Sequence, residues 1–344
     1  MKHRANFALF LSKITVLAFH KPGLTEQNET GETKSTESAK GYTKMSKPLS
    51  KNEFDVLVTM IEADRALSQR DLAERSGHSA STINRVMKSL TDLNYVCDGE
   101  ITKAGMAALE PYRAKRAVFI AAGFGSRLVP ITLNTPKPLV KVNGKRIIDG
   151  LIDACLEAGI EDIIIVRGYL AEQFDVLKYK YPNIQFYENP IYNEANNISS
   201  AMCTRFLLGN AYVFEADLLI SNPSIIKKYH YTSDFMGIKK DWSDDWCFTV
   251  NDGIITEQKV GGQGENNYQM VGISYWNAED GRKLSEHIDE AYHMPGGKER
   301  YWEQVPLVVF KDQYKVAINE CKDEDIVEID TFRELKAIDK TYDV

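Results

Sequence analysis

The stretch AVFIAAGFGSRLVPITLNTPKP, residues 117–138, decides the fold of this chain. Its first six residues are a continuous apolar run with β-branched members, which is typical of a strand buried on both faces of a parallel sheet. The run ends in Gly123-Phe124-Gly125-Ser126-Arg127, and a glycine loop with an arginine after a strand is typical of phosphate binding. Leu128 stands where a dinucleotide-binding fingerprint needs a third glycine, and no Gly-Lys-Ser/Thr follows, so neither of those two motifs is present.

Helix and strand patterns alternate after this loop. A helix is predicted over 147–158, a second buried strand over 162–166, a helix that ends at Tyr181, and a third strand over 184–187. Such alternation implies parallel strands joined by crossover helices. Residues 115–344 are therefore expected to form an α/β domain with a doubly wound, mostly parallel, Rossmann-like sheet.

The composition is that of an ordinary globular protein. Of the 344 residues, 43% are hydrophobic and 26% are charged, which excludes a disordered or fibrous chain. No apolar run approaches the ~20 residues that span a bilayer, so we expect no membrane partner. The five cysteines are scattered without a C-x-x-C pair, which argues against disulfides and zinc and favours a cytoplasmic location. With a net charge of -7, nucleic acid could be bound only through a local basic site.

The first 45 residues differ from the rest. The apolar segment 5–19 resembles a signal peptide only superficially, because Lys13 interrupts it and no small-x-small cleavage site follows. Residues 23–44 are rich in Thr, Glu, Ser, Gly and Lys, and such a segment cannot bury enough apolar surface to offset the entropy of ordering. We predict that residues 1–45 are a disordered leader.

Residues 46–114 are expected to form a small helical domain. Its first helix is marked by apolar residues at positions i, i+3, i+4 and i+7, namely Phe54, Leu57, Val58 and Ile61. A second helix is predicted over 69–75 with Gly77 after it, and a third helix ends near Leu93. Asp98-Gly99 then signals a β-hairpin. This order resembles a winged helix-turn-helix domain.

In such a domain the third helix enters the major groove of DNA. We therefore expect contacts to phosphates and base edges from its exposed positions Ser81, Thr82, Asn84, Arg85 and Lys88. The segment as a whole is nearly neutral, which weakens the electrostatic argument for DNA. The alternative is that this domain contacts protein, either the following domain or a second copy of the chain in a homodimer.

The second half of the quoted stretch is more specific. Its spacing G-x-G-x-R-x-x-P-x-T-x-x-x-P-K-P, residues 123–138, resembles the signature of nucleotidyltransferases that couple a nucleoside triphosphate to a phosphorylated small molecule. Glycines let backbone N–H groups approach a triphosphate closely. We expect Arg127 and Lys137 to act in catalysis, because they bring positive charge to the triphosphate and the developing pyrophosphate.

Two carboxylates end apolar strands elsewhere in the domain. Asp217 ends the segment YVFEAD, and Asp330 ends the segment IVEID. Ligands of open α/β sheets bind at the carboxyl ends of strands, so the two aspartates could hold one Mg²⁺ against the triphosphate. The resemblance to the nucleotidyltransferases implies the same role. The alternative is that each aspartate caps the following turn or helix, which the sequence after Asp330 also allows.

Six segments carry a narrower resemblance: AAGFGSRLVPITLNTPKPLVKVNGKRIID, GYLAEQF, NPIYNEANNISSA, VGISYWNAEDG, RYWEQV and EIDTFREL. Together they cover nearly all of residues 115–340 and resemble the bacterial CTP:phosphocholine cytidylyltransferases of cell-surface choline decoration. The resemblance implies that CTP and phosphocholine give CDP-choline and pyrophosphate in a magnesium-dependent in-line displacement. The alternative acceptors are 2-aminoethylphosphonate and phosphoethanolamine. A different class of function is a winged-helix transcription regulator with a nucleotide-sensing transferase domain.

A choline site needs aromatic faces and carboxylates, because a quaternary ammonium cannot donate N–H hydrogen bonds. The second half of the chain supplies both kinds of residue, and we expect choline contacts from Asp245, Trp246, Tyr275, Trp276, Tyr301, Trp302 and Glu303. Glu303 stands where the resembled family has an aspartate after two aromatic residues, and this longer side chain could reshape the amine site. The alternative for each aromatic residue is core packing.

The nucleotide is expected to contact two segments. The resemblance implies that the glycine loop and a polar loop after the third strand bind the nucleotide, through Ala121, Ala122, Gly123, Gly125, Ser126, Asn189, Asn196, Asn197 and Ser199. Asn amides could read a cytosine edge, although the same residues also favour turns. No general base is required, because a phosphate monoester is already an anionic nucleophile near neutral pH.

Overall fold

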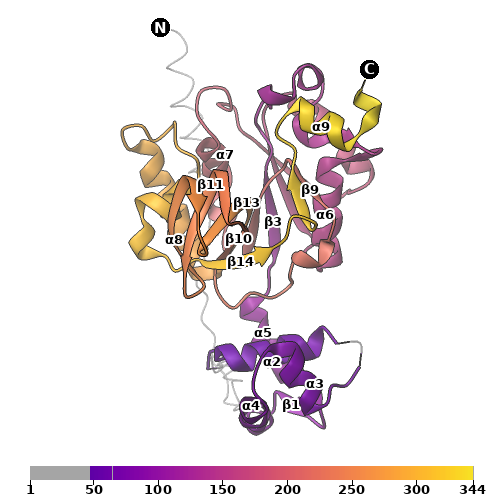
Figure 1. Ribbon diagram of the computed structural model, residues 1–344, viewed down its shortest axis with the longest axis vertical. Coiled ribbons are helices and arrows are strands. Elements are labelled where there is room, and N and C mark those ends of the chain that lie inside the picture. Colours follow the sequence, from indigo (N-terminus) through magenta and orange to yellow (C-terminus); the bar gives the residue numbers. More distant parts are fainter. Residues whose placement is uncertain (1–46, 64, 344) are drawn as a thin grey trace, which may run out of the picture. The chain divides into compact units, whose positions relative to one another are not determined.

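The computed structural model describes residues 47–63 and 65–343, so the predicted leader lies outside the described residues. The first domain follows the predicted order of helices and hairpin, with one more helix after the hairpin (Figure 1). Its elements are α2 (Lys51–Ile61), α3 (Gln69–Ser76), α4 (Ala80–Asp92), β1 (Val96–Cys97), β2 (Glu100–Ile101) and α5 (Lys103–Leu109).

Local sequence signals explain where these elements begin and end. Ser50, Ser68 and Ser79 cap the three helices α2, α3 and α4, each by accepting a hydrogen bond from a backbone N–H in the first turn. Gly77 ends α3 in the left-handed conformation with φ of 70°. Asp98 and Gly99 both have positive φ, as a two-residue hairpin turn requires, so the predicted β1–β2 hairpin is confirmed.

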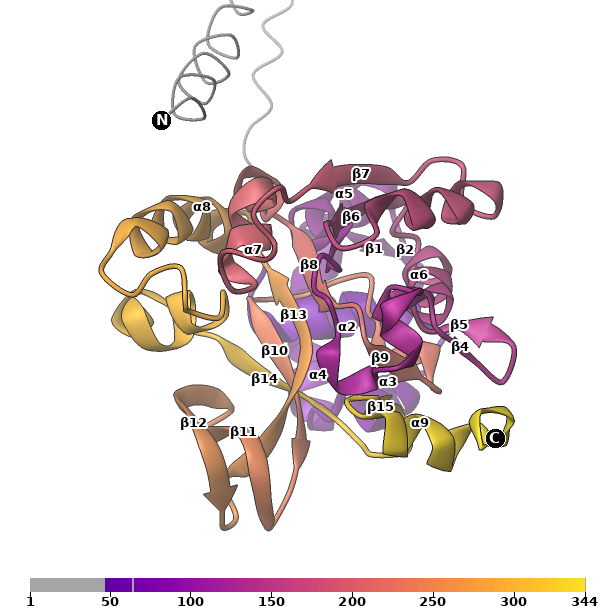
Figure 2. The ribbon, with the colours of Figure 1, turned by 90° about the horizontal axis from the view of Figure 1, so that it is seen from above.

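A nine-stranded sheet forms the centre of the second domain in the described residues (Figure 2). In spatial order its strands are β10 (Asp234–Lys239), β14 (Ala317–Cys321), β12 (Ile254–Gln263), β11 (Trp242–Asn251), β13 (Asn267–Trp276), β8 (Ala211–Glu215), β3 (Arg116–Ile120), β6 (Asp162–Arg167) and β7 (Gln185–Glu188). The four strands β8, β3, β6 and β7 are parallel, as predicted. The other half is largely antiparallel and begins where β13 pairs with β8, so the sheet is more mixed than the sequence indicated.

Helices cover both faces of the parallel half. Ala117 and Phe119 of β3 pack with α6 (Ile147–Glu157) and with the 3-10 segment η5 (Ala171–Tyr179). Val118 points to the opposite face and packs with α7 (Ile198–Thr204) and α8 (Ala278–His293). β3 is therefore buried on both sides, which is the physical reason for its uninterrupted apolar sequence.

Short elements complete this domain around the sheet. β15 (Ile326–Glu328) pairs antiparallel with β9 (Leu218–Ile220) in a separate two-stranded sheet, and α9 (Phe332–Ile338) follows it. The remaining elements are η1 (Glu110–Tyr112), η2 (Ser126–Leu128), η3 (Ile131–Leu133), η4 (Lys137–Leu139), β4 (Lys141–Val142), β5 (Lys145–Arg146), η6 (Arg205–Leu207), η7 (Pro223–Ile225), η8 (Val305–Val309), η9 (Lys311–Gln313) and η10 (Lys340–Tyr342). The β15–β9 pair brings residues more than a hundred positions apart next to each other.

The residues that follow α5 pair directly with segment 228–230 of the second domain. The Ala114 N–H donates to the Lys228 carbonyl, and the His230 N–H donates to the Tyr112 carbonyl. Tyr229 is buried among the core residues of the helical domain. Residues 47–114 and 115–343 thus share one contiguous set of contacts instead of being joined by a free linker.

Among the described residues, we find no helix with the length and apolarity that crossing a bilayer requires.

Candidate active site

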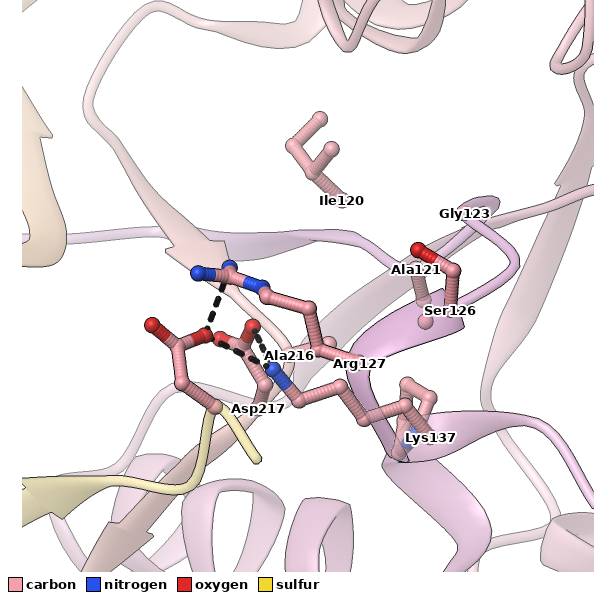
Figure 3. Close-up of a pocket in the computed structure, with 11 residues that line it drawn as sticks. Ile120, Ala121, Gly123, Ser126, Arg127, Lys137, Ala216 and Asp217 are labelled. Carbon is pink, nitrogen blue, oxygen red and sulfur yellow. Dashed lines mark hydrogen bonds and ion pairs between the residues drawn. The ribbon is translucent and has the colours of Figure 1, made fainter. Parts of the chain in front are cut away.

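The glycine loop after β3 is shaped by close contacts that only a residue without a side chain permits. Gly125 has a φ of 66°, and a Cβ added there would lie 3.0 Å from Cβ of Lys137. The hydroxyl of buried Thr132 donates to the Gly125 carbonyl at 2.9 Å. These contacts fold the loop back on itself, so that η2 presents Arg127 and η4 presents Lys137 from the same side (Figure 3).

The two predicted cations and the two predicted aspartates meet in one cluster. Lys137 Nζ lies 2.8 Å from Asp217 Oδ2 and 3.3 Å from Asp330 Oδ1. A guanidinium nitrogen of Arg127 lies 2.7 Å from Asp330 Oδ1. In Figure 3 the side chains of Arg127 and Lys137 both run from the loop toward Asp217. Side chains that the sequence separates by up to about two hundred positions therefore form a single site.

Charge in this cluster favours the ionised forms of Lys137 and Asp330. Burial by itself would lower the pKa of the Lys137 ammonium, but Asp217 and Asp330 outweigh burial and raise that pKa. Burial would raise the pKa of the Asp330 carboxyl, yet its Glu328 neighbour and the cations Lys137 and Arg127 keep that pKa below its usual range. Lys137 is thus a fixed positive charge at the floor of the cleft.

Two adjoining cavities form the cleft. The smaller, about 270 Å³, is lined by the loop and the charge cluster: Ile120, Ala121, Gly123, Gly125, Ser126, Arg127, Lys137, Pro138, Ala216, Asp217 and Asp330. The larger, about 460 Å³, shares Arg127, Asp217 and Asp330 with the first and extends to Asn197, Glu215, Asp245, Trp246, Met270, Tyr301, Glu303 and Glu328. The charge cluster beside the glycine loop is thus continuous with an acidic, partly aromatic cavity.

The donor set fits a divalent cation. Oδ1 of Asp217 is buried and has no hydrogen-bond partner among the described residues, and carboxylate oxygens of Glu215, Asp217 and Glu328 lie within 4.8 Å of one another. Oxygen ligands of this kind are those that Mg²⁺ prefers. Sequence reasoning singled out Asp217 and Asp330 but missed Glu215 and Glu328. The sequence does carry a signal for these two glutamates, because each lies two residues before one of the predicted aspartates. Side chains two residues apart on an extended chain point to the same side.

Carboxylates also dominate the far wall of the larger cavity. Glu303 is only 2% exposed, and its Oε2 has no hydrogen-bond partner in the part of the chain that the structure describes. Burial raises the pKa of Glu303 to about 7. Burial, with the neighbouring Glu303 and Asp217 carboxylates, raises the pKa of Glu215 well above its usual range. Burial together with Asp217 and Asp330 raises the pKa of Glu328 to about 9. Such a group of acids needs a positive partner to be fully ionised at neutral pH.

The backbone makes room for this acidic wall. Gly272 of β13 faces Glu215, and a Cβ added to Gly272 would lie 2.5 Å from a carboxylate oxygen of Glu215. Any larger residue at position 272 would therefore displace the Glu215 side chain.

The structure divides the seven residues expected to contact choline into two groups. Asp245, Trp246, Tyr301 and Glu303 line the larger cavity, and the rings of Trp246 and Tyr301 are 5.8 Å apart at 68°. Tyr275, Trp276 and Trp302 are at most 2% exposed and do not line it. Trp276 and Trp302 pack edge to face in the core under α8, and Tyr275 stacks on His230. The structure therefore brings two of the five predicted aromatic residues to the cavity.

The residues expected to contact the nucleotide are also divided. Ala121, Gly123, Gly125 and Ser126 line the smaller cavity, and Asn197 lines the larger one. Asn189 is buried and donates to the hydroxyls of Ser199 and Ser200, which makes it part of the support beneath the cleft. The remaining two lie outside both linings: the Asn196 side chain donates to the Glu299 carbonyl, and the Ala122 carbonyl accepts from the Tyr169 N–H.

The predicted DNA-contacting residues lie on one helix of the first domain. Ser81, Asn84, Arg85 and Lys88 are exposed on α4, whereas Ile83, Val86 and Leu90 are buried on its other side. Thr82 is half-buried, and its N–H donates to the cap residue Ser79. The amphipathic pattern of α4 is therefore as predicted.

Comparison with known proteins gives matches in both domains. Residues 116–223 match the nucleotidyl transferase family, and residues 49–96 match a winged helix-turn-helix DNA-binding family. The 2-aminoethylphosphonate cytidylyltransferase of Lancefieldella rimae is 36% identical over 69% of this chain and 98% of its own length. The choline-phosphate cytidylyltransferase of Streptococcus pneumoniae is 33% identical over 65% of this chain and 97% of its own length.

Solved structures agree with these relatives. The CTP:phosphocholine cytidylyltransferase from Streptococcus pneumoniae superposes with a TM-score of 0.61 at 32% identity and covers 67% of this chain and 99% of its own. An inositol-1-phosphate CTP transferase from T. maritima, at 17% identity and a TM-score of 0.53, shares the fold. With the paired aspartates and the glycine loop in one cleft, these matches show that the chain is an enzyme of the nucleotidyl transferase family whose relatives are cytidylyltransferases, with a winged helix-turn-helix domain before it.

Proposed function

We propose that this enzyme transfers CMP from CTP to a small acceptor that carries a phosphonate or phosphate at one end and a primary ammonium at the other, as in 2-aminoethylphosphonate. The carrying observation is the buried, unpartnered Glu303 carboxylate oxygen in a chamber that opens directly onto the glycine loop. Relatives of this chain act on 2-aminoethylphosphonate and on choline phosphate, so the acceptor is the open question.

The proposed step is a single displacement. An acceptor phosphonate or phosphate oxygen attacks the α-phosphorus of CTP, a new P–O bond forms, and the bond to pyrophosphate breaks. The acceptor oxygen is already anionic near neutral pH, so no side chain has to remove a proton. Arg127 and Lys137 offset the negative charge that develops on the departing pyrophosphate. Asp217, Glu215 and Glu328, whose carboxylate oxygens lie within 4.8 Å of one another, would hold Mg²⁺ together with the adjacent Asp330, and the ion supplies further charge neutralisation when bound.

The balance of side chains in the chamber favours a primary ammonium. A primary ammonium donates three hydrogen bonds and is best matched by carboxylates. Glu303 and Asp245 offer such acceptors on the walls of the larger cavity. A quaternary ammonium is usually bound by several aromatic faces, and Trp246 and Tyr301 provide only two.

Phosphocholine is the second candidate acceptor. The tilted pair of Trp246 and Tyr301, with Asp245 next to it, supports this reading and agrees with the narrower resemblance of the sequence. The two acceptors differ in hydrogen-bonding capacity, not in the reaction, so the experiment compares them on the same enzyme.

The test measures pyrophosphate release from CTP with 2-aminoethylphosphonate, phosphoethanolamine and phosphocholine under identical conditions. We expect the highest kcat/KM with a primary-amine acceptor, and higher turnover with CTP than with ATP, GTP or UTP. Phosphocholine as the best acceptor by tenfold or more would replace the first candidate with the second. No release with any of these acceptors would refute the proposal.

The winged helix supports a separate proposal, that α4 contacts DNA. Arg85 and Lys88 are exposed on α4 and form no ion pair with any of the described residues. Against this, residues 47–112 contain eight Lys and Arg and ten Asp and Glu, and the hairpin tip carries Asp98 and Glu100. Phosphate contacts would therefore be few, and binding should be weak and salt-dependent.

A gel-shift assay with the upstream DNA of the gene, with and without CTP, tests this second proposal. We expect a shift that the Arg85→Ala change weakens. An unchanged shift in that variant, or none for the wild type at low salt, would favour protein docking or a homodimer through this domain instead.

A further inference from the structure

Tyr169 connects the glycine loop to the end of a neighbouring strand. It lies two residues beyond the end of β6, and its hydroxyl lies 2.9 Å from the Thr132 carbonyl and 3.1 Å from the Leu133 carbonyl. Its own N–H donates to the Ala122 carbonyl at 3.0 Å. One residue thus holds the loop at its beginning, through Ala122, and again about ten positions later.

Other contacts extend this attachment along the loop. Nε2 of Gln173, on η5, donates to the Asn134 carbonyl at 2.9 Å, so three consecutive loop carbonyls accept hydrogen bonds from the segment after β6. The ring of Phe124 packs edge-on against the ring of Tyr169, with centroids 4.7 Å apart at 89°. The loop residues 123–136 are therefore fastened from outside the loop, not only by their own turns.

Thr132 connects the hydrogen bond from Tyr169 to Gly125 and Arg127 at the start of the loop. While the Thr132 carbonyl accepts from Tyr169, the Thr132 hydroxyl donates to the carbonyl of Gly125 at 2.9 Å. Gly125 precedes Ser126 and Arg127, and Arg127 reaches Asp330 at 2.7 Å. Losing the outer hydrogen bond would thus loosen the residue that sets the position of Gly125 and, through it, of Arg127.

We propose that Tyr169 is a positioning residue for nucleotide binding: its hydroxyl latches the loop in the shape that presents the glycine N–H groups and Arg127 to the triphosphate. This inference rests on the proposed function, because it takes the loop as the CTP-binding element. Preorganised donors bind a charged ligand without reordering at the moment of binding, so the latch should act on CTP and not on the acceptor.

The test compares Tyr169→Phe, which keeps the ring against Phe124 but removes the hydroxyl, with Tyr179→Phe as a matched control. Tyr179 is 92% exposed, and its hydroxyl makes no hydrogen bond in the described part of the chain. For Tyr169→Phe we expect an increase of about three- to tenfold in the KM for CTP. The KM for the acceptor and the Tm should stay unchanged, and amide hydrogen exchange over residues 125–128 should be faster. The control should behave as the wild type.

Gln173→Leu supplies a second variant, since it removes only the outermost hydrogen bond, and a smaller increase in the KM for CTP is expected. Wild-type KM and wild-type amide exchange in Tyr169→Phe would overturn the latch. A rise in the KM for CTP that appears only together with a fall in Tm, or an equal rise for the acceptor, would also overturn it by revealing a general structural role. If the wild type fails to bind CTP, the proposed function fails, whereas the amide-exchange comparison still tests the latch.

Discussion

The two ends of the cleft carry opposite chemistry. At the loop end, Arg127 and Lys137 place two cations over Asp217 and Asp330. At the acceptor end, Glu303 and its neighbouring acids share the wall with two aromatic rings, and Arg127 is the one Lys or Arg among the described residues that line the larger cavity. This difference is what the proposed zwitterionic acceptor requires, with its anionic group toward the cations and its ammonium toward the acids.

The largest expected effect comes from the loop end. Asp217→Asn keeps the shape of the side chain but removes the charge that pairs with Lys137 and that would hold the metal ion. We expect turnover to fall by about a thousandfold, measured as pyrophosphate release. The control Asp244→Asn changes an exposed aspartate on β11 and should leave turnover unchanged. Turnover of Asp217→Asn within tenfold of the wild type would contradict metal binding at this position.

Removing the buried cation should have the next largest effect. Lys137→Met retains the length of the side chain and loses the charge that lies between Asp217 and Asp330. We expect about a hundredfold lower kcat, because less charge opposes the developing pyrophosphate. Lys145→Met, at an exposed site, is the matched control. If kcat is retained and only the KM for the acceptor rises, Lys137 would belong functionally to the other end of the cleft.

At the acceptor end, Glu303→Gln should separate the two candidate acceptors. An amide cannot form the charge-assisted hydrogen bond to a primary ammonium, so the KM for 2-aminoethylphosphonate should rise by about ten- to thirtyfold. The KM for phosphocholine should rise less and that for CTP should not change. Steady-state kinetics with both acceptors measures the difference. An equal rise for both acceptors would mean that Glu303 acts by charge alone.

The smallest expected effect is the pH dependence of acceptor binding. Burial raises the pKa of Glu303 to about 7, so the carboxylate form decreases as the pH falls through that value. We expect the KM for the acceptor to rise by about fourfold between pH 8 and pH 6.5, while Glu303→Gln shows a flatter profile. A profile for Glu303→Gln as steep as that of the wild type would assign the titration to another group.

The same shift has a defined consequence for stability. Because the pKa of Glu303 is higher in the folded protein than in the unfolded chain, the folded state binds this proton more tightly. The resulting stabilisation is present at low pH and is lost as the pH rises through about 7. The Tm of Glu303→Gln relative to the wild type should therefore be higher at pH 8 than at pH 5, which thermal unfolding at the two values measures.

Much of the fold could be predicted because its signals are local. The cap residues Ser50, Ser68 and Ser79, the turn at Asp98-Gly99 and the buried run of β3 each specify structure over a few residues. The antiparallel half of the sheet was not predicted. The β11–β12 hairpin has a local signal in its Asp252-Gly253 turn, which sequence reasoning missed, whereas β13 pairs with β8 across about sixty positions of sequence. The helix that was expected before Tyr181 is a 3-10 segment, η5, and its buried residues are Phe174 and Leu177.

The candidate site divides in the same way. The glycine loop, Arg127 and Lys137 follow from motif spacing, the two aspartates follow from their places at the ends of apolar strands and from the family resemblance, and the structure brings all of them together. The sequence did not indicate which aromatic residues reach the cavity. Trp246 and Trp276 both lie in strands that contain polar as well as apolar residues. Whether a residue faces the cleft or the core depends on strand pairing and bulges, such as the register shift between Ser243 and Trp246.

By itself the sequence determined the order of the two domains, the parallel strands around β3 and the glycine loop with its two cations, because caps, turns and buried runs act between near neighbours. Only the tertiary structure decided that Glu303 and Glu215 form an acidic wall, that Tyr275, Trp276 and Trp302 belong to the core, and that Tyr169 fastens the loop. These are contacts between distant segments, and their geometry is set by how the sheet and its helices pack.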